Sequence, residues 1–78
     1  MLNMITLNVV ADRPTSITFV VKNIQEILVV SYGSKYRVQI VVVSGRAFFV
    51  YDDNDVYEYN TQAEAIVAKE ALMAKLND

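Results

Sequence analysis

The side chains best suited to covalent chemistry are few in this 78-residue chain, which has neither cysteine nor histidine. A serine nucleophile needs a neighbouring base, and histidine is the usual base near neutral pH. The two glycines are isolated, so they do not form a phosphate-binding loop. We therefore expect a non-enzymatic protein with no catalytic residues and no cofactor. The hydroxyls left without a histidine partner belong to Ser16, Ser31, Ser34 and Ser44.

An acidic run, Asp52-Asp53-Asn54-Asp55, could in principle hold a calcium ion, because carboxylate oxygens are its preferred ligands. Read as an EF-hand loop from Asp53, the run places Glu64 at the twelfth position. Tyr57 and Glu58, however, occupy positions that require an oxygen ligand and a glycine. The pattern favours a polar turn, and we expect no metal site.

A third group of residues combines cations with aromatic rings, the combination that binds single-stranded nucleic acid. Lys35, Arg37 and Gln39 alternate along one predicted strand and therefore share a face, with Tyr36 on the other face. Tyrosines from a neighbouring segment would have to supply the stacking rings. The nucleic-acid hypothesis therefore rests on Lys35, Arg37, Tyr57 and Tyr59.

The elements that position these residues are mostly strands. Alternating apolar and polar residues predict strands over 5–9 and 16–22, and β-branched and aromatic residues predict further strands over 27–32, 35–43, 47–51 and 56–59. Residues 23–30 are ambiguous, because Asn23 and Glu26 have the spacing of a capping box; the alternative is a bulge or bend leading into a strand, and we favour the strand. Short connections predict hairpins and turns throughout.

One helix is predicted, over residues 62–76, where nearly all residues favour helix. It begins at a capping box, Thr61-Gln-Ala-Glu64. The chain is therefore expected to form a single α+β domain over residues 1–78. Its architecture is an antiparallel β-meander of about five to six strands, with the C-terminal α-helix packed on one face.

Two segments do not alternate as a strand with one solvated face should. Val41-Val42-Val43 and Ile27-Leu28-Val29-Val30 are apolar throughout, so both faces of the sheet are apolar there. One helix covers only one face. We therefore expect the other face to meet another sheet, a second subunit or a partner. The interface candidates are Leu28, Val30, Val41 and Val43 on the sheet, with Leu72 and Leu76 on the helix.

The leading hypothesis is a small protein-interaction module that forms a homodimer or docks on a partner protein, in the manner of a viral or mobile-element accessory or inhibitor protein. A dimeric single-stranded nucleic-acid-binding protein is the first alternative, and its net charge of −2 provides no overall attraction for phosphates. A binder of small ligands in a dimer groove is the second. No apolar run has the length of a membrane span, so a cytoplasmic location without membrane contact is expected.

Overall fold

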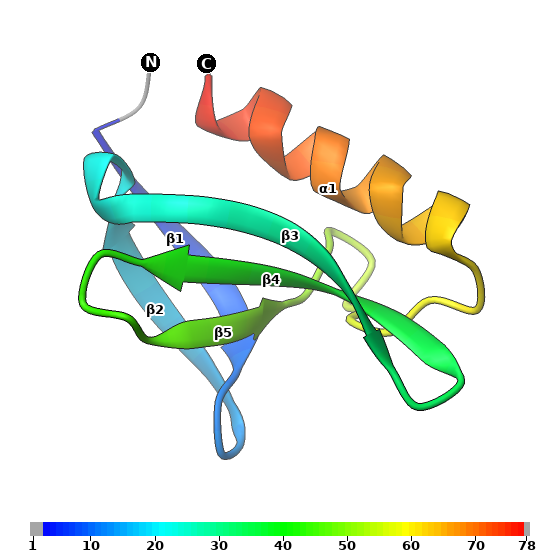
Figure 1. Ribbon diagram of the computed structural model, residues 1–78. Helices are drawn as coiled ribbons and strands as arrows, with labels where there is room; N and C mark the ends of the chain where they lie inside the picture. The colour runs from blue at the N-terminus through cyan, green and yellow to red at the C-terminus, as the bar shows by residue number, and fades with distance from the viewer. Residues whose placement is uncertain (1–2, 78) are drawn as a thin grey trace.

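The computed structural model describes residues 3–77 as five antiparallel strands and one C-terminal α-helix, an α+β fold (Figure 1). The elements in chain order are β1 (Met4–Val10), β2 (Pro14–Val20), the short 3-10 helix η1 (Val21–Asn23), β3 (Ile24–Tyr32), β4 (Lys35–Val42), β5 (Ala47–Val50) and α1 (Gln62–Leu76).

The strands follow the order β2-β1-β5-β4-β3 in one sheet. The predicted meander therefore holds for β3, β4 and β5, whereas β1 and β2 form a separate hairpin whose first strand pairs with β5. This join is short, because only Val9 with Val50 and Val10 with Phe49 are paired across it. Figure 1 shows β1 and β2 crossing behind β3–β5, so the sheet curls around its inner face.

Turn residues set where the strands end. Gly33 (φ 63°) and Ser34 make a two-residue hairpin loop between β3 and β4, and Gly45 (φ 90°) lies in the turn between β4 and β5. A positive φ costs glycine least, since it has no Cβ. Pro14 begins β2, an edge strand, where its missing N–H does not interrupt the sheet.

The ambiguous segment at residues 23–30 is a strand in the structure from Ile24 on, with Asn23 at the end of η1. β3 begins at Ile24, directly after η1, and its register against β4 shifts between Ile24 and Glu26. This shift is the β-bulge that was the alternative to a helix start. It leaves Leu28 and Val30 on one face of β3, with Ile27 and Val29 on the other.

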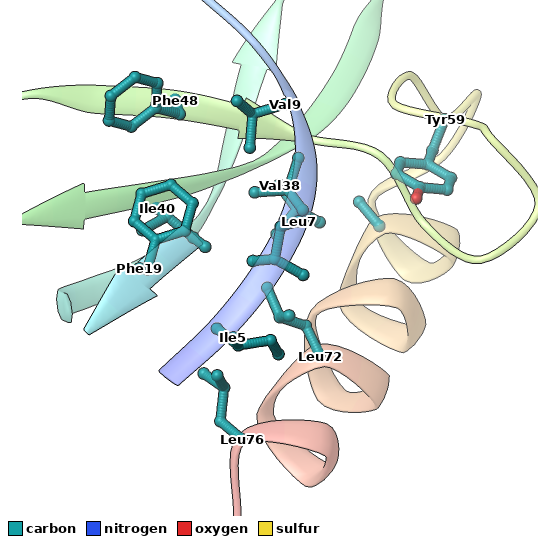
Figure 2. Close-up of a cluster of buried hydrophobic side chains, with 12 residues drawn as sticks. Ile5, Leu7, Val9, Phe19, Val38, Ile40, Phe48, Tyr59, Leu72 and Leu76 are labelled. Atoms are coloured by element: carbon teal, nitrogen blue, oxygen red, sulfur yellow. The ribbon is translucent and has the colours of Figure 1, made fainter. Parts of the chain in front are cut away.

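The core lies between the inner face of the curled sheet and α1 (Figure 2). Val9 and Ile40 are fully buried, and the Phe19 ring meets the Phe48 ring edge-on at 5.6 Å, which joins β2 to β5 across the curl. From α1, Leu72 reaches Leu7, and Leu76 reaches Ile5. The buried core residues are Ile5, Leu7, Val9, Phe19, Val38, Ile40, Phe48, Val50, Tyr59, Ala65, Leu72 and Leu76.

The predicted capping box starts the helix. The Thr61 hydroxyl accepts a hydrogen bond from the backbone N–H of Glu64 (3.2 Å), which satisfies one donor of the first turn. The reciprocal bond differs from the expected one, because the Glu64 carboxylate accepts from the Thr61 hydroxyl (3.0 Å) instead of from its backbone N–H.

The strand predicted over 56–59 is wrong. Only Tyr59 pairs with the sheet, through an isolated bridge to Tyr36. The cause is the Asp52 carboxylate, whose Oδ1 accepts from the backbone N–H groups of Asn54 (2.8 Å) and Val56 (3.0 Å). These contacts hold the chain in a turn where a strand would need the same groups for pairing.

Candidate functional site

The sheet has an outer face on the side of β3–β5 away from the core and the helix. Alternation along the strands puts Leu28 and Val30 of β3, Val41 of β4 and Phe49 of β5 there, and none of these four is fully buried or fully exposed. Leu28 lies opposite Gln39, and Gln39 lies opposite Phe49, so the three strands form one continuous surface. We call Leu28, Val30, Val41 and Phe49 the outer apolar patch.

An arginine at the border of this patch is held by aromatic rings. The Arg37 guanidinium carbon lies 3.8 Å from the centre of the Tyr32 ring, 4.7 Å from that of Phe49 and 5.0 Å from that of Tyr57. A cation over an aromatic face is attracted by the ring's quadrupole. The rings also contact one another, with Tyr32 and Phe49 edge-on at 5.6 Å. The arginine is thus fixed as part of an aromatic surface.

The charge of Arg37 is matched within the chain. Its Nη2 and Nε donate to the same carboxylate oxygen of Glu58, at 2.6 and 3.0 Å. The Arg37 side chain is 13% exposed and the Glu58 side chain 35%. Arg37 therefore brings no unpaired charge to the border of the patch, because Glu58 is its anionic partner. Such a surface presents apolar area and ring edges more than charge.

The loop that brings Tyr57 and Glu58 to this face is anchored by its neighbour Tyr59. The Tyr59 ring is buried, and its hydroxyl donates to Asp52 Oδ2 at 3.0 Å. Burial, followed by the hydrogen bond and the charge of Asp52, raises the pKa of the Tyr59 phenol well above its ordinary value. Backbone bonds between Tyr36 and Tyr59 tie the same loop to β4.

The predicted interface residues fall into two groups. Leu28, Val30 and Val41 lie on the outer face, as the apolar runs indicated, and Val43 lies just beyond the end of β4 with 62% of its surface exposed. Leu72 and Leu76 instead point into the core of their own chain. The large apolar residues of α1 that are exposed are Ile66, Val67 and Met73.

The residues proposed for nucleic-acid binding do not share one open surface. Lys35 donates to the side chain of Asn60, Arg37 is paired with Glu58, and Tyr59 is buried. Tyr57 remains partly exposed beside Tyr51, with ring centres 5.0 Å apart. Stacking of bases needs open ring faces next to free cations, and the arrangement here directs these cations to other partners.

The aromatic surroundings of Arg37 were missed in the sequence. The hairpin at Gly33-Ser34 pairs Tyr32 with Lys35, which places Tyr32 diagonally across from Arg37. This part was recoverable from the hairpin register. The pairing with Glu58 was not, since it depends on the irregular loop that the Asp52 carboxylate builds.

The acidic turn is occupied by contacts within the chain. Asp52 bonds the backbone of the turn, Asp53 lies 2.6 Å from the Lys75 ammonium, and Asp55 adopts a positive φ of 61°. Within residues 3–77, no group of three or more acidic side chains is placed to hold a metal ion. The same part of the chain holds no helix that is both long and apolar enough to cross a membrane.

Comparison with protein-family models, with curated protein sequences and with solved structures finds no match for this chain.

Proposed function

We propose that the protein is a non-enzymatic protein-interaction module, which forms a homodimer or docks on a partner protein. The outer apolar patch carries the proposal. Four half-buried apolar side chains from three strands share the sheet face that α1 leaves uncovered, with Gln39 between Leu28 and Phe49. Contiguous exposed apolar surface, bordered by polar groups, is typical of protein-binding sites.

The composition around the patch favours a protein surface as its occupant. Interfaces between proteins are rich in tyrosine, phenylalanine and arginine and poor in lysine. Tyr32, Phe49 and Tyr57 surround Arg37, and Glu58 neutralises it. The contacts within the chain also hold these side chains in place, which lowers the entropy lost when a partner binds.

Light scattering at low micromolar concentration, together with binding of an apolar fluorescent dye, tests this function. We expect either a mass above that of one chain, 8.8 kDa, or a monomer that binds the dye at the outer apolar patch. Val41→Asp should weaken whichever signal is seen, because it places a charge in the patch. The matched control is Thr18→Asp, on the exposed side of β2.

A strictly monomeric protein that binds no dye would overturn the proposal. A signal that Thr18→Asp reduces as much as Val41→Asp would also count against it, because the effect would then come from added charge and not from the patch.

A further inference from the structure

A cleft lies at the end of the curled sheet where β2 ends beside the turn between β4 and β5 (Figure 1). It is open to solvent and encloses about 670 Å³. Thr18 and Val20 of β2 line one side, and Val42 and Val43 line the other. In the strand order β1 separates β2 from β5, and β1 itself joins β5 through only two residue pairs. Among residues 3–77, therefore, no backbone ladder closes the sheet across this cleft.

The walls of the cleft are apolar and lead into the core. Phe19 and Phe48, whose rings meet edge-on, line it from inside and are only 6% and 5% exposed. Val20 and Val42 are half-buried, and Val43 is well exposed. Sites for small molecules typically combine such apolar walls with a few polar groups that fix orientation. An occupant of this cleft therefore needs an apolar portion narrow enough to reach the two rings.

Arg46 supplies the charge of the cleft. Its guanidinium carbon lies 5.0 Å from the centre of the Phe48 ring, so the cation is held beside the apolar wall. Neither salt bridge of residues 3–77 includes Arg46, although the chain has a net charge of −2. Among the described residues, no acidic side chain lines this cleft. Charge complementarity therefore selects an anionic occupant.

Two neutral polar side chains share the lining with Arg46. Asn23, at the end of η1, and Ser44, in the turn after β4, are both exposed. The backbone N–H of Val43 donates to the Asn23 carbonyl at 2.9 Å, which ties the two segments together. An amide, a hydroxyl and a guanidinium are all hydrogen-bond donors. The polar part of the lining therefore suits an acceptor with more than one oxygen.

We propose that this cleft binds a small amphipathic carboxylate, the chemistry of a medium-chain fatty acid. The carboxylate lies against the Arg46 guanidinium, whose forked N–H groups match two oxygens. The alkyl chain lies between Val20 and Val43 and reaches the rings of Phe19 and Phe48. Because these rings are nearly buried, a single alkyl chain reaches them where the broad surface of a folded protein would meet only the rim.

The first test is a titration with decanoate, kept below its micelle-forming concentration and followed by two-dimensional NMR. We expect saturable shifts of the backbone signals of residues 18–20 and 42–48, which line the cleft or adjoin its lining. Decyltrimethylammonium has the same alkyl chain with the opposite charge and should not bind there. Acetate has the charge without the chain and should give no saturable shifts.

The second test changes the cation. Arg46→Gln should raise the Kd for decanoate about tenfold, because it removes a charge-assisted pair of hydrogen bonds. Arg46→Lys keeps the charge without the fork and should lose less. The matched control is Arg13→Gln, an exposed arginine of the turn between β1 and β2 and outside the cleft, which should leave the Kd unchanged.

Shifts that do not saturate, or that gather on the outer apolar patch instead, would overturn the site. Equal binding of decyltrimethylammonium in the cleft, or an equal loss of affinity in Arg13→Gln, would overturn the role of Arg46 and with it the carboxylate. The cleft shares no residue with the outer apolar patch. Light scattering and dye binding of Arg46→Gln should therefore match the wild type at that patch, so this inference and the proposed function can fail independently.

Discussion

At the scale of single residues, Tyr59 links the core to the loop that completes the candidate site. Its ring is buried, its hydroxyl bonds Asp52, and its backbone bonds Tyr36. The neighbouring Tyr57 and Glu58 reach Arg37 from the same loop. The placement of the site therefore depends on a phenol that must stay protonated.

We expect the free energy of unfolding to fall as pH rises above 10.0, the ordinary pKa of tyrosine. The pKa of Tyr59 is raised in the folded state, so the unfolded chain loses this proton first. The stabilisation is complete below that pH and declines above it by up to about 1.4 kcal/mol per pH unit. Urea unfolding at pH values from about 8 to about 11, on either side of the ordinary tyrosine pKa, measures this fall in stability.

Tyr59→Phe is the control, since it removes only the hydroxyl. The variant should be less stable near neutral pH by about 1 kcal/mol, and its stability should depend less steeply on alkaline pH than that of the wild type. Equal slopes for the two proteins would contradict the assignment, because they differ only in the Tyr59 hydroxyl.

At the scale of elements, the start of α1 is set by local hydrogen bonds. The Thr61 hydroxyl satisfies the N–H of Glu64, and the buried residues of α1 then follow at helical spacing. Thr61→Ala should therefore destabilise the protein by about 1 kcal/mol, as loss of an N-cap does elsewhere. Thr61→Ser keeps the hydroxyl and should lose less. Thermal unfolding monitored by circular dichroism compares them, and equal losses would exclude the cap as the cause.

Local patterns predicted most of these elements. The hairpin at Gly33-Ser34, the cap at Thr61 and the alternation in β1 each depend on neighbouring residues, and all three are confirmed. The strand over 56–59 failed because its backbone groups bond the Asp52 carboxylate, a contact that alternation does not encode. The predicted meander holds for β3, β4 and β5 but not for β1, which pairs with β5, because that pairing joins residues distant in the sequence.

The candidate site was predictable as far as it depends on strand parity, the alternation of successive side chains between the two faces of a strand. Parity placed Leu28, Val30 and Val41 together, and the register confirms one face for them. Parity cannot say which side of the helix meets the sheet, and Leu72 and Leu76, expected at an interface, lie in the core. Helical spacing alone leaves that choice open when apolar residues cover more than one side.

At the scale of the whole molecule, the two faces of β4 have different surroundings. The Ile40 side chain lies on the inner face of β4 and is fully buried in the core, whereas the side chain of its neighbour Val41 lies on the outer face. We expect Ile40→Asp to unfold the protein, at a cost of about 4 kcal/mol or more, because it buries an unpaired charge. Val41→Asp should remain folded, as two-dimensional NMR spectra of both variants would reveal. An unfolded Val41→Asp would contradict the placement of the outer face.

The short join between β1 and β5 also has a consequence for synthesis on the ribosome. The β1–β2 hairpin emerges before β5 and α1, so Val9 gains its neighbour Val50 only when β5 has been made, and Leu7 gains Leu72 later still. An isolated two-stranded hairpin is marginal in water. The nascent β1–β2 hairpin therefore carries an uncovered apolar stripe until β5 and then α1 have left the exit tunnel.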